Sequence, residues 1–167
     1  MKFCFPLGFQ RLRVRQGTIG RMRVLALDIG KVRTGIAVSD PKECVASPAC
    51  VLPTEDVLAG AASWKRVLED WEPDVLLAGL PLSLDGKPGS QARRIRAAAE
   101  GIAASCNLPI EFADERLSSA EAKRSLHESG LSEREMRGKV DMIAACLFLQ
   151  AWLDEKNAQP TDKETGA

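Results

Sequence analysis

Residues 24–38 of the chain are Val24-Leu25-Ala26-Leu27-Asp28-Ile29-Gly30-Lys31-Val32-Arg33-Thr34-Gly35-Ile36-Ala37-Val38. The first four form a continuous apolar run, which is typical of a strand buried on both faces of a sheet. Residues 30–33 predict a turn, and the β-rich residues 34–38 predict a returning strand that completes a hairpin. Because Asp28 directly follows the apolar run, the hairpin is expected to place a carboxylate at the rim of the sheet.

Further strands and helices follow the hairpin in an order that indicates the fold class. A weaker β-rich segment over residues 45–52 predicts a third strand, and apolar residues at helical spacing over 57–68 predict one helix. The sequence then predicts a strand at 74–80, a helix at 90–106 with Ser90 as its N-cap, and a strand at 110–113. A capping box at Ser118 opens another helix, a second capping box lies at Ser132, and the last helix is expected over 139–155.

The lengths of the connections predict how the strands pair. The first three strands are joined by short links and are expected to be antiparallel. Strands four and five each follow a helix, so they are expected to join the first strand in parallel through right-handed crossovers. The fold class is therefore α/β, with a five-stranded mixed sheet flanked by helices. Strands one, four and five end at one edge, where open α/β sheets usually bind ligands.

The composition fits a single domain and excludes several classes of protein. The 167 residues are 45% hydrophobic and 28% charged, as expected of a globular chain, and no apolar run reaches the roughly 18 residues of a membrane span. The formal net charge is zero, so a nucleic-acid site has to be a local basic patch. The five cysteines form no C-x-x-C pair, which favours a reducing, cytoplasmic location over a disulfide framework or a zinc site.

Charge also divides the chain into parts. The first 23 residues carry six Lys and Arg residues and no acid, and the first strand begins just beyond them. We therefore expect residues 1–21 to be a flexible basic extension, residues 22–156 to form the domain and residues 157–167 to be a polar tail. The extension is an arm for RNA, a translated leader upstream of Met22, or a disordered end.

Three carboxylates lie at junctions that this fold is expected to bring together. Asp28 ends the first strand, Glu115 follows the fifth, and Asp141 lies in the first turns of the last helix, which is expected to pack over the sheet. Carboxylates this close repel one another, and a hard divalent cation with oxygen ligands relieves the repulsion. The arrangement suits metal-assisted attack of water on a phosphodiester.

Each carboxylate taken singly has a plainer explanation. Asp28 could cap the turn at Gly30, and Asp141 could be a first-turn acid favoured by the helix dipole. Asp114 competes with Glu115 for a place at the site. Because neighbours in an extended segment point to opposite faces, only one of the two is expected there.

Four blocks of the sequence resemble the YqgF/RuvX family, in the same order along the chain. They are residues 26–40, 79–86, 114–119 and 140–150, and the resemblance as a whole covers about residues 22–156. It implies an RNase H-like fold similar to that of Holliday-junction resolvases. Members of the family are assigned as nucleases that mature the 5′ end of the 16S rRNA precursor. The pattern favours Glu115 over Asp114.

The same resemblance implies the chemistry of the site. Asp28, Glu115 and Asp141 would be the catalytic residues and would bind Mg²⁺ or Mn²⁺, with two ions. One ion would activate the attacking water and the other would stabilise the leaving 3′ oxygen. The implied partner is precursor 16S rRNA in the ribosomal particle.

Basic residues beside the acids are candidate substrate contacts. Lys31, Arg33 and Arg116 flank the acids, and Arg93 stands near the start of the helix at 90–106, where a cation opposes the helix dipole. Each could bind a phosphate. Salt bridges would explain the first three as well, and a solvated helix face would explain Arg93.

Other functions share part of this pattern. A Holliday-junction-resolvase-like DNA nuclease would use the same three acids on DNA junctions, and a non-catalytic RNA- or ribosome-binding module could keep the fold. An ATPase of the actin and hexokinase type would need a second such domain, for which the chain is too short. The three acids would serve RNA processing and junction cleavage alike, so it is the family resemblance that favours the RNA nuclease. The sequence leaves the oligomeric state open.

Overall fold

In the computed structural model, the part of the chain that is described is organised by a sheet of five strands in the order β3-β2-β1-β4-β5. β1 (Val24–Ile29) pairs antiparallel with β2 (Arg33–Ser39), and β2 pairs antiparallel with β3 (Ala46–Pro53) at one edge. On the other side, β4 (Val75–Leu80) pairs in parallel with β1, and β5 (Ile110–Asp114) pairs in parallel with β4. The predicted mixed sheet of three antiparallel strands and two parallel additions is confirmed.

The structure describes residues 22–81, 89–115 and 133–158. Within the last range, only the backbone is described for residues 133–138. The predicted basic extension over residues 1–21 and the helix opening at Ser118 lie outside these ranges, as does most of the predicted tail. Within the described ranges, no helix combines the length and the apolar character that a membrane crossing would require.

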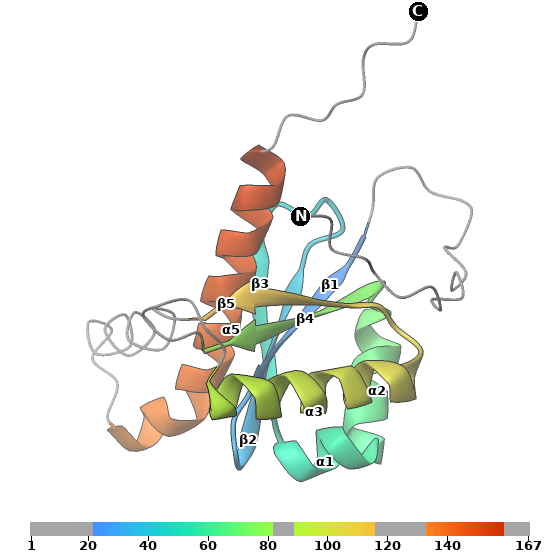
Figure 1. Cartoon of the computed structure of the whole chain (residues 1–167). Coiled ribbons are helices and arrows are strands. Elements are labelled where there is room, and N and C mark those ends of the chain that lie inside the picture. The colour runs from blue at the N-terminus through green and yellow to red at the C-terminus, as the bar shows by residue number, and fades with distance from the viewer. Residues whose placement is uncertain (1–21, 82–88, 116–132, 159–167) are drawn as a thin grey trace, which may run out of the picture.

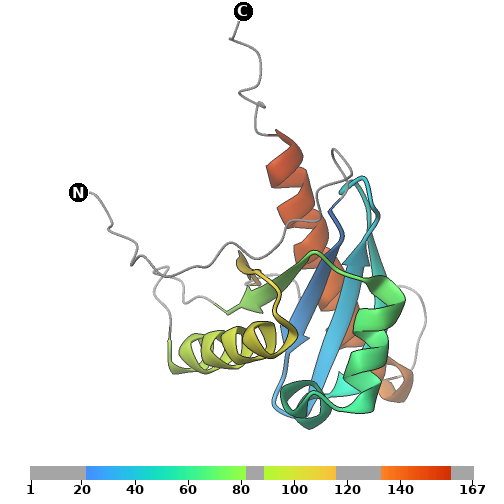
Figure 2. The ribbon, with the colours of Figure 1, turned by 90° about the vertical axis from the view of Figure 1, so that its right-hand side faces the viewer.

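Helices cover both faces of the sheet (Figure 1). α1 (Thr54–Ala59), α2 (Ala62–Trp71) and α3 (Ser90–Cys106) lie on one face, and the long α5 (Glu133–Ala158) runs across the other. In Figure 2, α5 passes behind β1 and β2, on the side of the sheet away from α2. The strands are buried on both sides as a result, which explains why β1 and β4 are almost continuously apolar.

Alternation along each strand decides which side chain meets which helix. In β1, Leu25 and Leu27 belong to the core formed with α1, α2 and α3. Val24 and Ala26 belong to the core formed with α5, where Phe148 is fully buried. The same parity rule extends to the polar residues at the strand ends and decides which of them face α5.

Three helix predictions need correction. The helix expected over 57–68 is two helices, because Gly60 adopts a left-handed conformation (φ 63°) that closes α1. Ser90 is the first residue of α3 rather than its N-cap, which is Gly89. The last helix runs from Glu133 to Ala158, beyond the expected range 139–155 at both ends, and it begins directly after the predicted capping box at Ser132.

The C-terminal half of α5 is tied to the connection between β2 and β3. The Gln150 carboxamide accepts a hydrogen bond from Ala46 N (2.9 Å) and donates one to the carbonyl of Cys44 (3.0 Å). Six residues further along the helix, Lys156 Nζ lies 2.6 Å from Glu43 Oε1. These contacts fix the position of α5 along the sheet, and therefore fix where its N-terminal half meets the strand ends.

Candidate active site

The three predicted acids lie where the carboxyl ends of β1 and β5 meet α5. Asp28 shares the strand parity of Val24 and Ala26, which face α5. Glu115 shares the parity of Ala113, which also packs on that side, and its backbone N–H continues the ladder by donating to Leu80 O (3.1 Å). Two strand ends and one helix therefore direct carboxylates into the same space.

The geometry also separates Glu115 from its neighbour in sequence. Asp114 has the opposite parity, that of Phe112, which packs on the α3 side, and it is exposed. Glu115 is partly buried and forms a side-chain hydrogen bond with Asp28. The structure thus brings Glu115, and not Asp114, to Asp28.

A glycine in β2 allows α5 to approach the sheet closely. Gly35 is the cross-strand partner of Asp28. A Cβ atom at Gly35 would overlap the backbone carbonyl group of Asp141 and would lie 2.6 Å from Met142 N. The absence of a side chain at this position lets the backbone of α5 lie directly against β2, one strand away from Asp28.

A second glycine makes room for Glu115. A Cβ atom at Gly79 of β4 would lie 2.8 Å from Glu115 Oε2 and 2.8 Å from Cε1 of Phe148. The carboxylate of Glu115 and the aromatic ring of Phe148 therefore both lie over the end of β4, where Gly79 has no side chain.

The buried carboxyl pair holds a proton at neutral pH. Burial raises the pKa of Asp28 to about 8, with further upward contributions from the carboxylates of Glu115 and Asp141 and from the hydrogen bond to Glu115. Burial also raises the pKa of Glu115, but the hydrogen bond with Asp28 lowers it. Because a hydrogen bond between two carboxyl groups needs a proton, Asp28 and Glu115 share one.

Asp141 reaches the site from within α5 and has a cationic neighbour. Its Oδ2 lies 3.6 Å from Arg33 Nε, and the side chains of Asp141 and Arg33 are 32% and 45% exposed. Because α5 begins at Glu133, Asp141 lies in the third turn of the helix. The helix dipole acts only within the first turn, so it does not account for an acid at this position.

The donor set suits Mg²⁺ or Mn²⁺, which prefer carboxylate oxygens. The raised pKa of Asp28, caused by burial and by the carboxylates around it, shows negative charge crowded into a poorly solvated place. Among the described residues, no group of three Asp, Glu, His or Cys side chains is arranged closely enough to hold a metal ion. Asp28 and Glu115 share a proton, while Asp141 faces Arg33. Metal binding therefore requires Asp28 to lose its proton.

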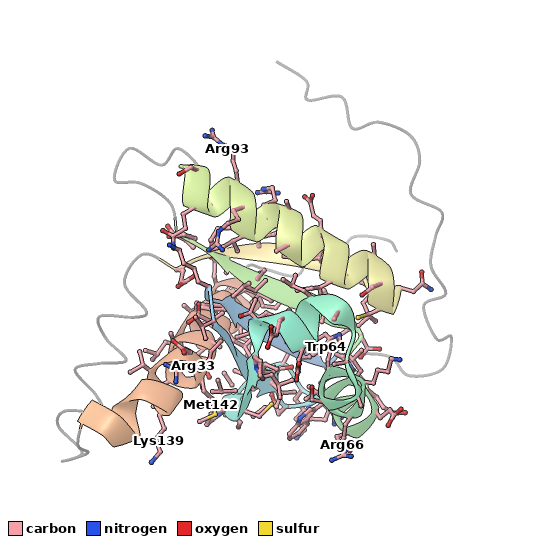
Figure 3. All side chains as sticks on the ribbon, turned by 90° about the horizontal axis from the view of Figure 1, so that it is seen from below. Arg33, Trp64, Arg66, Arg93, Lys139 and Met142 are labelled. Carbon is pink, nitrogen blue, oxygen red and sulfur yellow. The ribbon has the colours of Figure 1, made fainter. Side chains whose placement is uncertain are left out.

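The predicted substrate contacts fall into three groups. Lys31 and Arg33 are exposed on the turn between β1 and β2, next to the acids. Arg93 points away from the sheet at the start of α3, whereas Arg33 lies beside α5 (Figure 3). Arg116 lies outside the described residues.

Sequence reasoning missed the residues that shape the site without carrying its charge. Isolated glycines inside strands, as at Gly35 and Gly79, are a recognised signal of close backbone approach and could have been noticed. Thr54 is different. Its buried hydroxyl donates to Gly30 O (3.0 Å) and lies 2.9 Å from Thr34 Oγ1, and no local pattern in the sequence announces this contact.

The order of the strands, together with carboxylates at the ends of β1 and β5 and on the helix that crosses them, defines a protein of the RNase H-like fold. Within this class, the chain belongs to the RuvX family. The family model, described as Holliday junction resolvase, matches residues 22–155. The predicted family is therefore confirmed.

Relatives and a solved structure agree with this assignment. A protein of Anaeromyxobacter sp. (strain Fw109-5) is 44% identical over 82% of this chain and its own full length. One of Thermosynechococcus vestitus is 39% identical over 80% of this chain and 89% of its own. Both are named "Putative pre-16S rRNA nuclease". The fold is similar to that of Thermus thermophilus RuvC in complex with a Holliday junction substrate, with a TM-score of 0.50, 17% identity, and 82% and 97% of the two chains covered.

These matches also confirm the prediction that the chain is an enzyme of a nuclease family. The family description and the names of the relatives denote different nucleic-acid substrates.

Proposed function

We propose that this chain is a cytoplasmic, metal-dependent nuclease that hydrolyses RNA phosphodiester bonds and matures the 5′ end of precursor 16S rRNA. The observation that carries the proposal is the convergence of three carboxyl groups at the carboxyl edge of the sheet, Asp28 from the end of β1, Glu115 from the end of β5 and Asp141 from α5. The choice of RNA is supported by the names of relatives that are 39% and 44% identical over four fifths of the chain.

In this mechanism, Asp28, Glu115 and Asp141 would hold the metal. A bound divalent ion supplies a Lewis acid that polarises the phosphodiester and lowers the pKa of water. Asp28 gives up the proton that it shares with Glu115, so that both carboxylates offer oxygen ligands. Arg33 and Lys31 hold the phosphates of the strand beside the acids. Water adds to phosphorus, and the 3′ oxygen leaves with a proton, which yields a 5′-phosphate end.

Cleavage should depend on Mg²⁺ or Mn²⁺ and should not occur with Ca²⁺. Calcium takes oxygen ligands at longer distances and in looser geometry, so it would bind the acids without placing water correctly. Adding EDTA should abolish cleavage of a labelled RNA. In the absence of RNA, Mn²⁺ should raise the melting temperature of the protein, because a ligand that binds only the folded state stabilises it. Full activity in excess EDTA would contradict the role of the acids.

RNA should be cut in preference to a four-way DNA junction. The relatives with the higher identity are named for rRNA, whereas the junction-bound resolvase shares 17% identity and supports the fold alone. A resolvase must also cut two strands symmetrically, which calls for paired active sites in a two-fold dimer. The test compares a precursor 16S leader RNA with a synthetic junction, at equal enzyme and salt concentrations.

We expect cleavage of the leader RNA at least tenfold faster than cleavage of the junction. The family description names junction resolution, so this is the second candidate function. Faster and symmetric cutting of the junction would establish that candidate and overturn the assignment to RNA. Cleavage of neither substrate, with Mn²⁺ still stabilising the protein, would favour a binding module.

A further inference from the structure

Val32 is an exposed apolar residue beside the acids. Its relative exposure is 76%, the highest among the large hydrophobic residues that the structure describes, which include Val45 at 54% and Leu58 at 51%. Val32 lies in the turn between β1 and β2, between the exposed cations Lys31 and Arg33. Single exposed apolar residues are common on protein surfaces and need no explanation by themselves. The position of Val32 beside the acids and the rigidity of its turn, however, call for an explanation.

The backbone that carries Val32 is held by hydrogen bonds on both sides. Gly30 N donates to Arg33 O (2.9 Å), which closes the turn, and Thr54 N donates to the carbonyl of Val32 itself (2.9 Å). The Thr54 hydroxyl donates its only proton to Gly30 O, so the buried Thr34 hydroxyl must be the donor in the 2.9 Å contact between the two threonines. The turn is thereby preorganised.

The charges around the turn indicate what its tip would meet. Arg33 Nε lies 3.6 Å from Asp141, so the guanidinium is already inside the proposed active site. Lys31 stands on the other side of Val32. In a single strand of nucleic acid, phosphates alternate with exposed bases. The two cations would bind phosphates, and the apolar side chain between them would pack against the face of a base.

We propose that Val32 packs against an unstacked base of a single-stranded substrate, next to the phosphate that is cleaved. The inference rests on the proposed nuclease function and deepens it, because it makes the substrate class a strand with unpaired bases. In a duplex, the bases remain stacked and paired, and the side chain of a rigid turn reaches only the sugar-phosphate surface. The valine therefore discriminates single strands from duplexes.

The test compares Val32→Thr with the parent protein. Threonine has nearly the same shape, but its hydroxyl opposes packing against the face of a base. Val45→Thr is the matched control, since Val45 is also exposed but belongs to the connection between β2 and β3, at the opposite end of β2. A second variant, Val32→Ala, removes methyl groups without adding a polar atom. Melting curves establish that each variant is folded.

Binding is measured in an Asp28→Asn background by fluorescence anisotropy, so that no cleavage occurs. The probes are a leader oligoribonucleotide with 2-aminopurine substituted in turn at each position, and the same strand annealed to its complement. We expect Val32→Thr and Val32→Ala to weaken single-strand binding about fivefold, on the order of the burial of one or two methyl groups, and to leave duplex binding unchanged. One 2-aminopurine position should lose its fluorescence change in both Val32 variants, and Val45→Thr should behave like the parent.

Unchanged single-strand affinity in the Val32 variants, or an equal loss on the duplex, would overturn the proposal. These outcomes are distinct from failure of the nuclease assignment. If the unaltered protein cuts no RNA but the base signal still depends on Val32, the base contact stands and the nuclease function falls. If the protein binds no single-stranded RNA, both fall.

Discussion

Replacing Asp28 by asparagine should abolish cleavage and, in metal-free buffer, make the folded protein more stable. The carboxylate is needed as a metal ligand, and electrostatic stabilisation by a bound metal amounts to several kcal/mol of the barrier. Its loss corresponds to a rate decrease on the order of a thousandfold. The shape of the side chain is retained, and the amide of the substituted asparagine can still donate a hydrogen bond to the Glu115 carboxylate.

The gain in stability follows from the raised pKa of Asp28. Burial, together with Glu115 and Asp141, raises this pKa to about 8, well above its value in an unfolded chain. Between about pH 4 and pH 8 the folded state therefore binds more protons than the unfolded state, and the stability of the parent protein falls as pH rises through that window. The variant does not lose stability in this way. In the parent protein, the loss in the free energy of unfolding grows by at most about 1.4 kcal/mol per pH unit and reaches a few kcal/mol near pH 8.

Urea denaturation in EDTA at several pH values between 4 and 8 measures this effect. The groups that face Asp28 are Glu115 and Asp141, with Arg33 beside Asp141, and they are the same in both proteins. Asp70→Asn is a suitable control, because Asp70 is exposed in α2, which precedes the opposite end of β4. Parental cleavage rates in purified Asp28→Asn would refute the catalytic role. A stability difference that does not change with pH would refute the buried, proton-sharing pair.

The strands and their pairing could be predicted because burial on both faces leaves a plain apolar signal. The run at residues 24–27 and the helices before strands four and five define the order of the sheet, and the structure confirms it. The helix break at Gly60 could not be predicted from apolar spacing, since the pattern of Val57, Trp64 and Val67 continues across it. The left-handed backbone at Gly60 and the extended backbone at Ala61 separate α1 from α2.

In the site too, some features follow from the local sequence, whereas others depend on tertiary packing. The convergence of Asp28 and Glu115 follows from parity along the strands and could be predicted. The proton that they share depends on burial beside Gly79 and Phe148, which only the packing of α5 creates. The ion pair of Arg33 and Asp141 likewise depends on where α5 crosses β2. Gln150 and Thr54 act through contacts that are distant in sequence and leave no local pattern.

Replacing Gly35 by alanine adds a single methyl group and should reduce cleavage nearly as much as the loss of Asp28. The cause would be a displacement of α5 and not the loss of a metal ligand. In Gly35→Ala, the new Cβ would overlap the backbone carbonyl group of Asp141 and approach Met142 N to 2.6 Å. Helix backbone cannot rotate out of the way as a side chain can, so α5 has to move away from β2. Overpacking usually costs about 1–3 kcal/mol, and we expect the upper end of this range.

Displacement of α5 would also carry Asp141 away from Asp28, so cleavage should fall by at least a hundredfold even in the molecules that remain folded. The measurements are thermal unfolding, with an expected decrease of roughly 10 °C, and the rate of RNA cleavage below the melting transition. Gly101→Ala is the matched control, because Gly101 lies in α3 and a Cβ there would have no described atom within 4 Å apart from its chain neighbours and the backbone of its own helix. Alanine in a helix should stabilise that variant by up to about 1 kcal/mol and leave cleavage unchanged. If Gly35→Ala were as stable and as active as the parent, α5 could not lie as close to β2 as the structure places it, and Asp141 would have to reach the site in another way.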